Sequence, residues 1–189
     1  SGTGKSQKVK ELAFLTCPKD GVLNADSTTP GNYCLIEVKP NWHDSTELLG
    51  YYSNLTEKYT ITPFLHFVHK AATNPDVPFF VCLDEMNLAP VEEYFAEFLS
   101  AIESRSFEDK KYITDPIIKP FNSFGSAKNE KGAEINVGDM MINTLFPNFK
   151  ASDTDSEATN VIKHFRTKGL TLPKNLIVIG TVNMDETTF

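Results

Sequence analysis

The chain has 189 residues, of which 40% are hydrophobic and 23% charged, an ordinary composition for one globular domain with a real core. Its net charge of -7 argues against a surface built to grip nucleic acid, which needs clustered Lys and Arg. No apolar run approaches the roughly 18 to 20 residues of a membrane helix. The cysteines, Cys17, Cys34 and Cys82, lack C-x-x-C spacing, which predicts free thiols and a cytoplasmic location.

The chain opens with Ser1-Gly2-Thr3-Gly4-Lys5-Ser6, the second half of the phosphate-binding pattern G-x-x-x-x-G-K-[ST]. The first glycine and the strand that feeds such a loop would lie before residue 1, so we expect a fragment. Glycine backbone can approach a triphosphate closely and direct several N–H groups at it. A terminal Gly/Ser-rich linker is the alternative, but the helical spacing that follows favours the loop. The expected nucleotide-binding residues are Gly2, Thr3, Gly4, Lys5 and Ser6, with Ser6 also binding Mg²⁺.

Helices and strands alternate along the rest of the chain. Apolar residues at helical spacing predict helices over residues 5–15, over 63–73 with Thr62 as the N-cap, and from Pro90 to Ile102. A strand is expected over residues 33–38. Residues 79–83 and 176–179 are continuous apolar runs, which are typical of strands buried on both faces of a parallel sheet. The pattern predicts an α/β fold with right-handed crossovers.

Residues 105–175 are richer in Lys, Asp, Asn, Gly and Ser than the flanking segments. Only short apolar pieces interrupt them, such as residues 113–118 and 140–146. A short helix is expected over residues 161–166 and a small hairpin elsewhere. We interpret this segment as an insertion between two core strands.

Polar residues follow both apolar strands at their carboxyl ends, where open α/β sheets bind ligands. Asp84 and Glu85 end the first strand, and Asn183 follows the second. We expect Asp84 to hold Mg²⁺ opposite Ser6, and Glu85 to deprotonate an attacking water, with Asn183 helping to place it. A solvated acidic pair and a turn-capping Asn are the alternatives when each is taken alone.

These three motifs in this order resemble the core of an AAA+ ATPase, a P-loop NTPase with a three-layer sandwich around a parallel sheet. More narrowly, the chain is similar to McrB-type motor subunits of methylation-dependent restriction systems, a dynein-related subfamily. Residues 40–51 and 172–176 support the narrower similarity. The resemblance implies Walker A roles for Gly2, Gly4, Lys5 and Ser6, Walker B roles for Asp84 and Glu85, and a sensor 1 role for Asn183.

The resemblance also implies what the chain lacks. Residues 1–189 would be a partial AAA+ domain without its first strand, its arginine finger and its C-terminal lid. Such motors form ring hexamers, so the isolated fragment is expected to be inactive. The implied partners are a nuclease subunit and DNA, the latter bound through a domain not present here, and no membrane.

Two questions stay open at this level. McrB proper uses GTP, but the Asn183-Met184-Asp185-Glu186 segment departs from its pattern, so ATP is preferred over GTP as the substrate. The alternative functions are a MoxR- or dynein-related remodelling chaperone, and a nucleotide-binding interaction module without turnover. Trp42 is expected to pack inside, with a subunit-contacting loop as the alternative. Tyr51 and Tyr52 suggest either a pore loop or buried helix packing.

Overall fold

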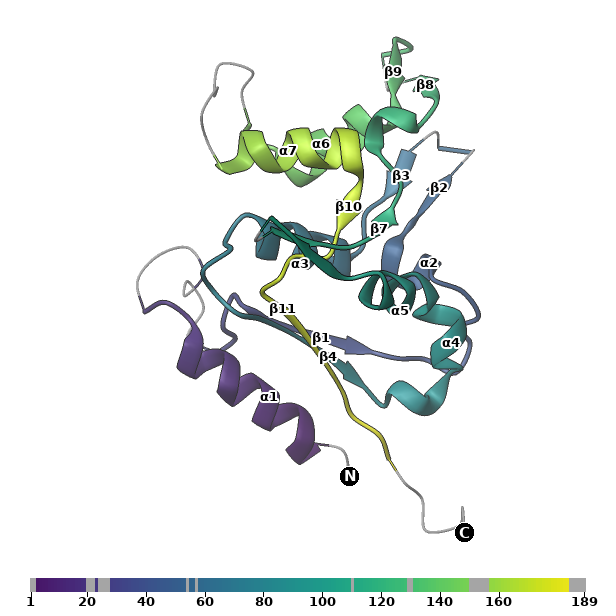
Figure 1. Cartoon of the computed structure of the whole chain (residues 1–189). Coiled ribbons are helices and arrows are strands. Elements are labelled where there is room, and N and C mark those ends of the chain that lie inside the picture. The colour runs from purple at the N-terminus through teal and green to yellow at the C-terminus, as the bar shows by residue number, and fades with distance from the viewer. Residues whose placement is uncertain are drawn as a thin grey trace.

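The computed structural model describes residues 3–19, 23, 28–53, 55–56, 58–109, 111–128, 131–149 and 157–183. Its centre is a sheet of three parallel strands, which are β1 (Tyr33–Glu37), β4 (Phe79–Asp84) and β11 (Leu176–Gly180). They lie in the order β1-β4-β11, so β4 is the middle strand (Figure 1). The predicted α/β class and parallel sheet are confirmed.

Helices cover both faces of this sheet. On one face, α1 (Thr3–Thr16) packs Val9 and Ala13 against Phe80 and Cys82 of β4. On the other face, Phe79, Val81 and Leu83 enter a larger core with α3 (Pro63–Ala72). Because successive side chains of a strand point to opposite faces of the sheet, the apolar run of β4 contributes residues to both hydrophobic cores.

The strand β11 is less buried than its sequence predicts. Ile177 is 39% exposed, whereas the predicted strand was buried on both faces. In the described part of the chain, only β4 pairs with β11, so its second edge has no strand beside it. An apolar run shows that a strand is suited to burial. Whether the strand is buried on both faces depends on its position in the sheet.

The segment between β1 and α3 combines a short helix and a hairpin. Helix α2 (Thr46–Leu49) is followed by β2 (Tyr51–Ser53) and β3 (Lys58–Thr60), which pair antiparallel. Tyr51 and Tyr52 therefore lie on a strand, and helix packing of this pair is wrong. Thr62 caps α3 by accepting a hydrogen bond from the backbone N–H of Leu65, as predicted. Trp42 is packed inside, with its ring 5.4 Å from that of Tyr94.

The helix predicted from Pro90 to Ile102 is two helices. A 3-10 turn η2 (Met86–Leu88) precedes α4 (Val91–Tyr94), and α5 (Ala96–Glu103) follows. Phe95 leaves the helical conformation between them, with φ -117° and ψ 12°. This break keeps the aromatic residues Tyr94, Phe95 and Phe98 in the core but leaves Leu99 partly exposed.

Residues 105–175 contain more regular structure than their composition suggests. Two of their helices, α6 (Val137–Leu145) and α7 (Glu157–Lys168), form the upper lobe in Figure 1. Phe121, Phe146 and Phe165 from this segment belong to the same hydrophobic core as Phe79 of the sheet. The remaining elements are β5 (Ser106–Glu108), β6 (Lys111–Ile113), β7 (Pro116–Ile118), η3 (Phe121–Ser123), β8 (Ser126–Lys128), β9 (Glu134–Asn136) and β10 (Leu170–Thr171).

The strands of this segment form two local hairpins and one pair between distant strands. Hairpins form between β5 and β6 and between β8 and β9, while β7 pairs antiparallel with the distant β10.

None of the helices in the described ranges combines the length and apolar character needed to cross a bilayer.

Candidate functional site

The three segments singled out in the sequence meet at the carboxyl ends of β4 and β11. Ser6 Oγ, in the first turn of α1, donates a 2.5 Å hydrogen bond to Asp84 Oδ1. Lys5 Nζ donates to the carbonyl of Val182 at 2.6 Å. The Asn183 amide donates to the Glu85 carboxylate. Side chains from distant parts of the chain therefore form one connected polar cluster.

The parallel register of the sheet explains why these strand ends coincide. Gly180 of β11 lies beside Leu83 of β4, so residues 181–183 continue beside Asp84 and Glu85. Backbone hydrogen bonds extend this pairing past the strands, from Thr181 N–H to Leu83 and from Met86 N–H to Thr181. The helix α1 lies over the same strand and directs its first turn toward this edge, as Figure 1 shows.

Thr181 is a residue of this cluster that the sequence did not single out. Its Oγ1 donates to Asp84 Oδ1 at 2.7 Å and accepts a 3.0 Å hydrogen bond from the backbone N–H of Glu85. The side chain is only 5% exposed. Asp84 Oδ1 thus receives two hydroxyl donors, from Ser6 and from Thr181. The signal that could have identified it is its position, since Thr181 directly follows β11 where that strand reaches the edge marked by Asp84.

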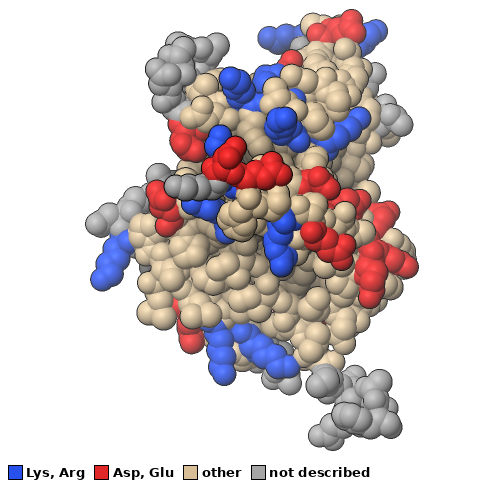
Figure 2. Space-filling model, viewed as in Figure 1, with Lys and Arg blue, Asp and Glu red and all other residues tan. Residues whose placement is uncertain are grey.

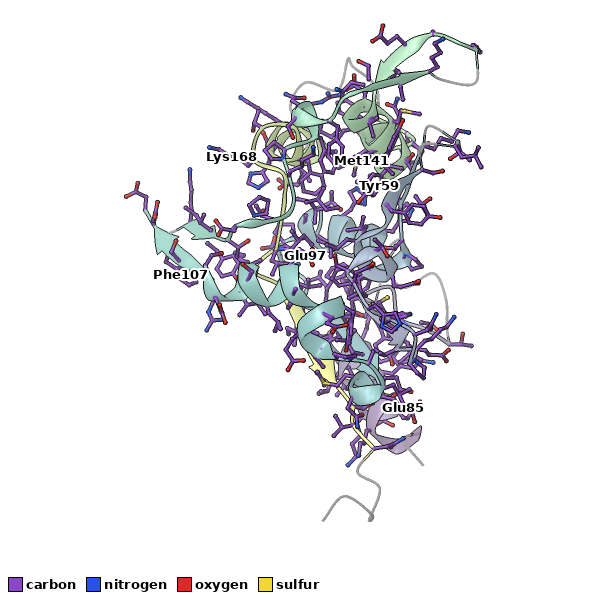
Figure 3. All side chains as sticks on the ribbon, turned by 90° about the vertical axis from the view of Figure 1, so that its right-hand side faces the viewer. Tyr59, Glu85, Glu97, Phe107, Met141 and Lys168 are labelled. Carbon is purple, nitrogen blue, oxygen red and sulfur yellow. The ribbon has the colours of Figure 1, made fainter. Side chains whose placement is uncertain are left out.

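The backbone at Glu85 is in the left-handed region, with φ 53° and ψ 47°. This conformation is uncommon for a residue with a side chain and costs about 1 to 2 kcal/mol. The bonds of Thr181 to the N–H groups of Glu85 and Met86 hold it, and the Tyr94 hydroxyl adds a 2.9 Å bond to the Met86 carbonyl. Strained backbone of this kind is concentrated at functional sites. Figure 3 shows Glu85 at the end of the molecule where α1 begins.

Two neutral groups lie beside the cluster. The Tyr33 hydroxyl donates to the Ser6 carbonyl at 3.4 Å. Burial raises the pKa of Tyr33 well above its usual range, and Cys82 and the Asp84 carboxylate raise it further. Burial likewise raises the pKa of the Cys82 thiol. Both shifts favour the neutral phenol and the neutral thiol at neutral pH.

An open pocket of about 480 Å³ borders the Ser6–Asp84 pair. Its volume falls within the range of about 300 to 1,000 Å³ typical of small-ligand sites. The lining residues come from α1, from β1 with the residues before it, and from the end of β4. They are Ser6, Gln7, Lys10, Thr29, Tyr33, Leu35 and Asp84.

The donor atoms of the cluster suit Mg²⁺ better than a transition metal. Ser6 and Asp84 offer hydroxyl and carboxylate oxygens, and the described residues contain no group of three His, Cys, Asp or Glu side chains placed to hold a metal. Magnesium in phosphate sites needs only one or two carboxylates, because phosphate oxygens and water complete its shell. The residues present therefore fit a magnesium ion that arrives with a phosphate ligand.

The remaining predicted site residues are at the start of the chain. Gly2 lies outside the described residues, while Thr3 and Gly4 form the beginning of α1, two residues before the predicted helix start. A Cβ atom added to Gly4 would meet no atom within 4 Å, so this end of α1 is open. No family model matches the chain, and no curated protein matches it.

Proposed function

We propose that this chain binds a nucleoside triphosphate with Mg²⁺ and hydrolyses it within the assembled protein. The hydrogen bond between Ser6 and Asp84 carries the proposal, because it joins the Gly-Lys-Ser element to the acidic strand end. A P-loop site needs these two oxygen groups side by side to hold the metal. Spacing in the sequence predicts the motifs separately but not their contact.

The start of α1 suits phosphate. Free backbone N–H groups and the helix dipole attract anions at a helix N-terminus, and Lys5 adds a mobile positive charge. In this structure the Lys5 ammonium donates to a backbone carbonyl, that of Val182, at 2.6 Å. We propose that Lys5 exchanges this carbonyl for the β- and γ-phosphate oxygens when nucleotide binds, while its hydrocarbon stem stays in place.

Glu85 and Asn183 supply the hydrolytic groups of the proposal. Glu85 would accept the proton of the attacking water, a role worth about 10² to 10⁴ in rate, and Asn183 would orient that water. Ser6 and Asp84 would hold the metal ion, and the ion would neutralise part of the negative charge of the phosphates. The amide of Asn183 already restrains the Glu85 carboxylate.

The sheet order supports the AAA+ class as a proposal. The observed order is β1-β4-β11. In the order 5-1-4-3-2 of that class, these strands would take the places of strands 2, 3 and 4. Strand 1 would then lie along the edge of β11 that faces away from β4, where the described residues contain no strand. We extend the proposal to a cytoplasmic ring motor of the McrB type that uses ATP, with an arginine from the neighbouring subunit, a nuclease partner and a separate DNA-binding domain.

The test measures nucleotide binding and phosphate release by the full-length protein with and without Mg²⁺. Lys5→Ala should abolish binding of a fluorescent ATP analogue, whereas Lys8→Ala, an exposed lysine on the same helix, should not. Glu85→Gln should bind ATP but release phosphate at least 100-fold more slowly. Failure of the wild type to bind either ATP or GTP would refute the proposal.

Two other results would redirect the proposal. Equal phosphate release by wild type and Glu85→Gln would remove Glu85 as the base. Tight binding without turnover in the wild-type ring would indicate a nucleotide-binding interaction module.

A further inference from the structure

Besides the pocket beside Ser6 and Asp84, the molecule has a groove between the β5–β6 hairpin and the end of α7. It is an open groove of about 920 Å³, lined by residues of β6, α7 and the connection from β10 to β11. Figure 3 shows its two sides, with Phe107 on the projecting hairpin and Lys168 on the lobe above it. A smaller pocket of about 280 Å³ continues it past His164 and Thr171 toward α3.

Positive charge gathers around this groove. Lys111, Lys168 and Lys174 come from three separate segments and line it together. All three side chains are exposed, and none forms an ion pair with a described carboxylate. Figure 2 shows Lys and Arg over the lobe that carries α6 and α7, above a band of Asp and Glu. A chain with a net charge of -7 therefore still places three lysines around one groove, none of them paired with a carboxylate in the described ranges.

The hairpin adds an exposed aromatic pair. Phe107 and Tyr112 face each other across the two strands, with their ring centroids 5.4 Å apart. Tyr112 lines the groove, and Phe107 is 74% exposed. Aromatic rings beside a cationic groove are the features that bind single strands, because every base offers a flat face for stacking.

We propose that this groove binds single-stranded nucleic acid, with the three lysines on the phosphates and the Phe107–Tyr112 pair against a base. An acidic peptide would use the lysines but would have no need of exposed stacking rings, so the nucleic acid is favoured. The inference goes beyond the proposed function, which assigns DNA binding to another part of the protein. It depends on none of the residues of the Asp84 cluster.

Two carboxylates oppose this role, Glu157 in the smaller pocket and Glu108 in the groove itself. The second of them gives a test in which the proposal predicts tighter binding. Glu108 also lines the groove and lies opposite Lys111 in the hairpin. Its negative charge repels phosphate. Removal of this charge should strengthen binding, a gain that damage to the fold would not produce.

The experiment measures the binding of a fluorescent 12-nucleotide oligo(dT) by anisotropy, between 50 and 200 mM salt. Lys168→Gln and Lys174→Gln should each weaken binding and flatten the log–log salt slope by about 0.7, the value for one phosphate contact on a single strand. Phe107→Ala should weaken binding roughly 5- to 150-fold through lost stacking. Glu108→Gln should tighten binding, and Lys8→Gln on α1 is the matched control that should leave it unchanged.

Three results would overturn the proposal. The first is no measurable binding by the wild type at 50 mM salt. The second is equal binding by the wild type and the groove variants, or a weakening by Glu108→Gln. The third is full displacement of the oligonucleotide by poly-glutamate together with no effect of Phe107→Ala, which would assign the groove to an acidic peptide instead.

Discussion

Ser6 and Asp84 are 78 positions apart in the chain, yet a 2.5 Å hydrogen bond joins them between the first turn of α1 and the last residue of β4. Thr181 donates to the same carboxylate oxygen from the adjacent strand end. Asp84 is therefore held from two sides before any ligand binds. Such preorganisation lowers the cost of ordering the carboxylate when a metal arrives.

Thr181→Val should impair both stability and metal use. The change removes one donor to Asp84 and leaves the Glu85 N–H without its acceptor, which should lower the free energy of unfolding by about 1 to 3 kcal/mol. The Mg²⁺ concentration for half-maximal phosphate release should rise. Urea unfolding and a Mg²⁺ titration measure the two effects. Thr181→Ser keeps the hydroxyl and should restore metal use, so equal defects in both variants would contradict this role.

Asn175→Ala should destabilise the junction between α3 and the sheet. The Asn175 amide lies within 3.0 Å of three backbone carbonyls, those of Ala71, Asn74 and Val77. Loss of this donor removes the hydrogen bond to the Val77 carbonyl, while the carbonyls of Ala71 and Asn74 keep their backbone donors. We expect the free energy of unfolding to fall by about 1 to 3 kcal/mol. Urea denaturation measures it. Asn41→Ala, at an exposed asparagine, is the control and should change stability by less than about 0.5 kcal/mol.

Phe165→Ala should loosen the lobe that carries α6 and α7. Phe165 is 1% exposed and packs its ring 5.7 Å from Phe121 and 6.3 Å from Phe146. The cavity left by its removal should cost about 3 to 5 kcal/mol in urea unfolding. Phe107→Ala deletes the same group from a 74% exposed position and should cost little. Equal losses in the two variants would mean that Phe165 does not anchor the lobe.

Because of His69, the free energy of unfolding should decrease as the pH is lowered from about 6.5 to about 4. Burial, followed by the nearby His66, lowers the pKa of His69 from 6.5 to about 4, and its ring lies 4.2 Å from that of Phe146. Between these values the unfolded chain binds more protons than the folded chain, so folding weakens as the pH falls, by up to about 1.4 kcal/mol per pH unit. Above pH 6.5 both states are neutral at this position and the effect is absent.

Urea unfolding at several pH values from 4.5 to 7.5 measures this slope. His69→Leu removes the titrating group and should flatten the dependence in that window, leaving only the contribution of other groups. His66→Gln, at an exposed histidine, should keep most of the slope. A wild-type slope identical to that of His69→Leu would show that His69 does not titrate in this way.

Capping residues and the spacing of apolar residues predicted those helices and strands whose formation depends on residues nearby in the sequence. The Thr62 cap and the apolar spacing after it located α3, and the apolar run before Asp84 located β4. The break at Phe95 was missed because Tyr94, Phe95 and Phe98 fit one helical stripe. In the structure Tyr94 packs on Trp42 before the break, and Phe98 packs on Phe64 after it. Thr181 was missed because its role depends on two partners in another strand.

The sequence by itself determined which segments form the helices and strands of the sheet and which polar residues end the strands, because these depend on side-chain periodicity and on local capping. Only the tertiary structure decided that Ser6, Asp84, Glu85 and Asn183 form one cluster, and that among the described strands β11 pairs with β4 alone. It also decided that lysines from three segments surround one groove. Contacts between residues far apart in the chain depend on strand order and register, which no local pattern specifies.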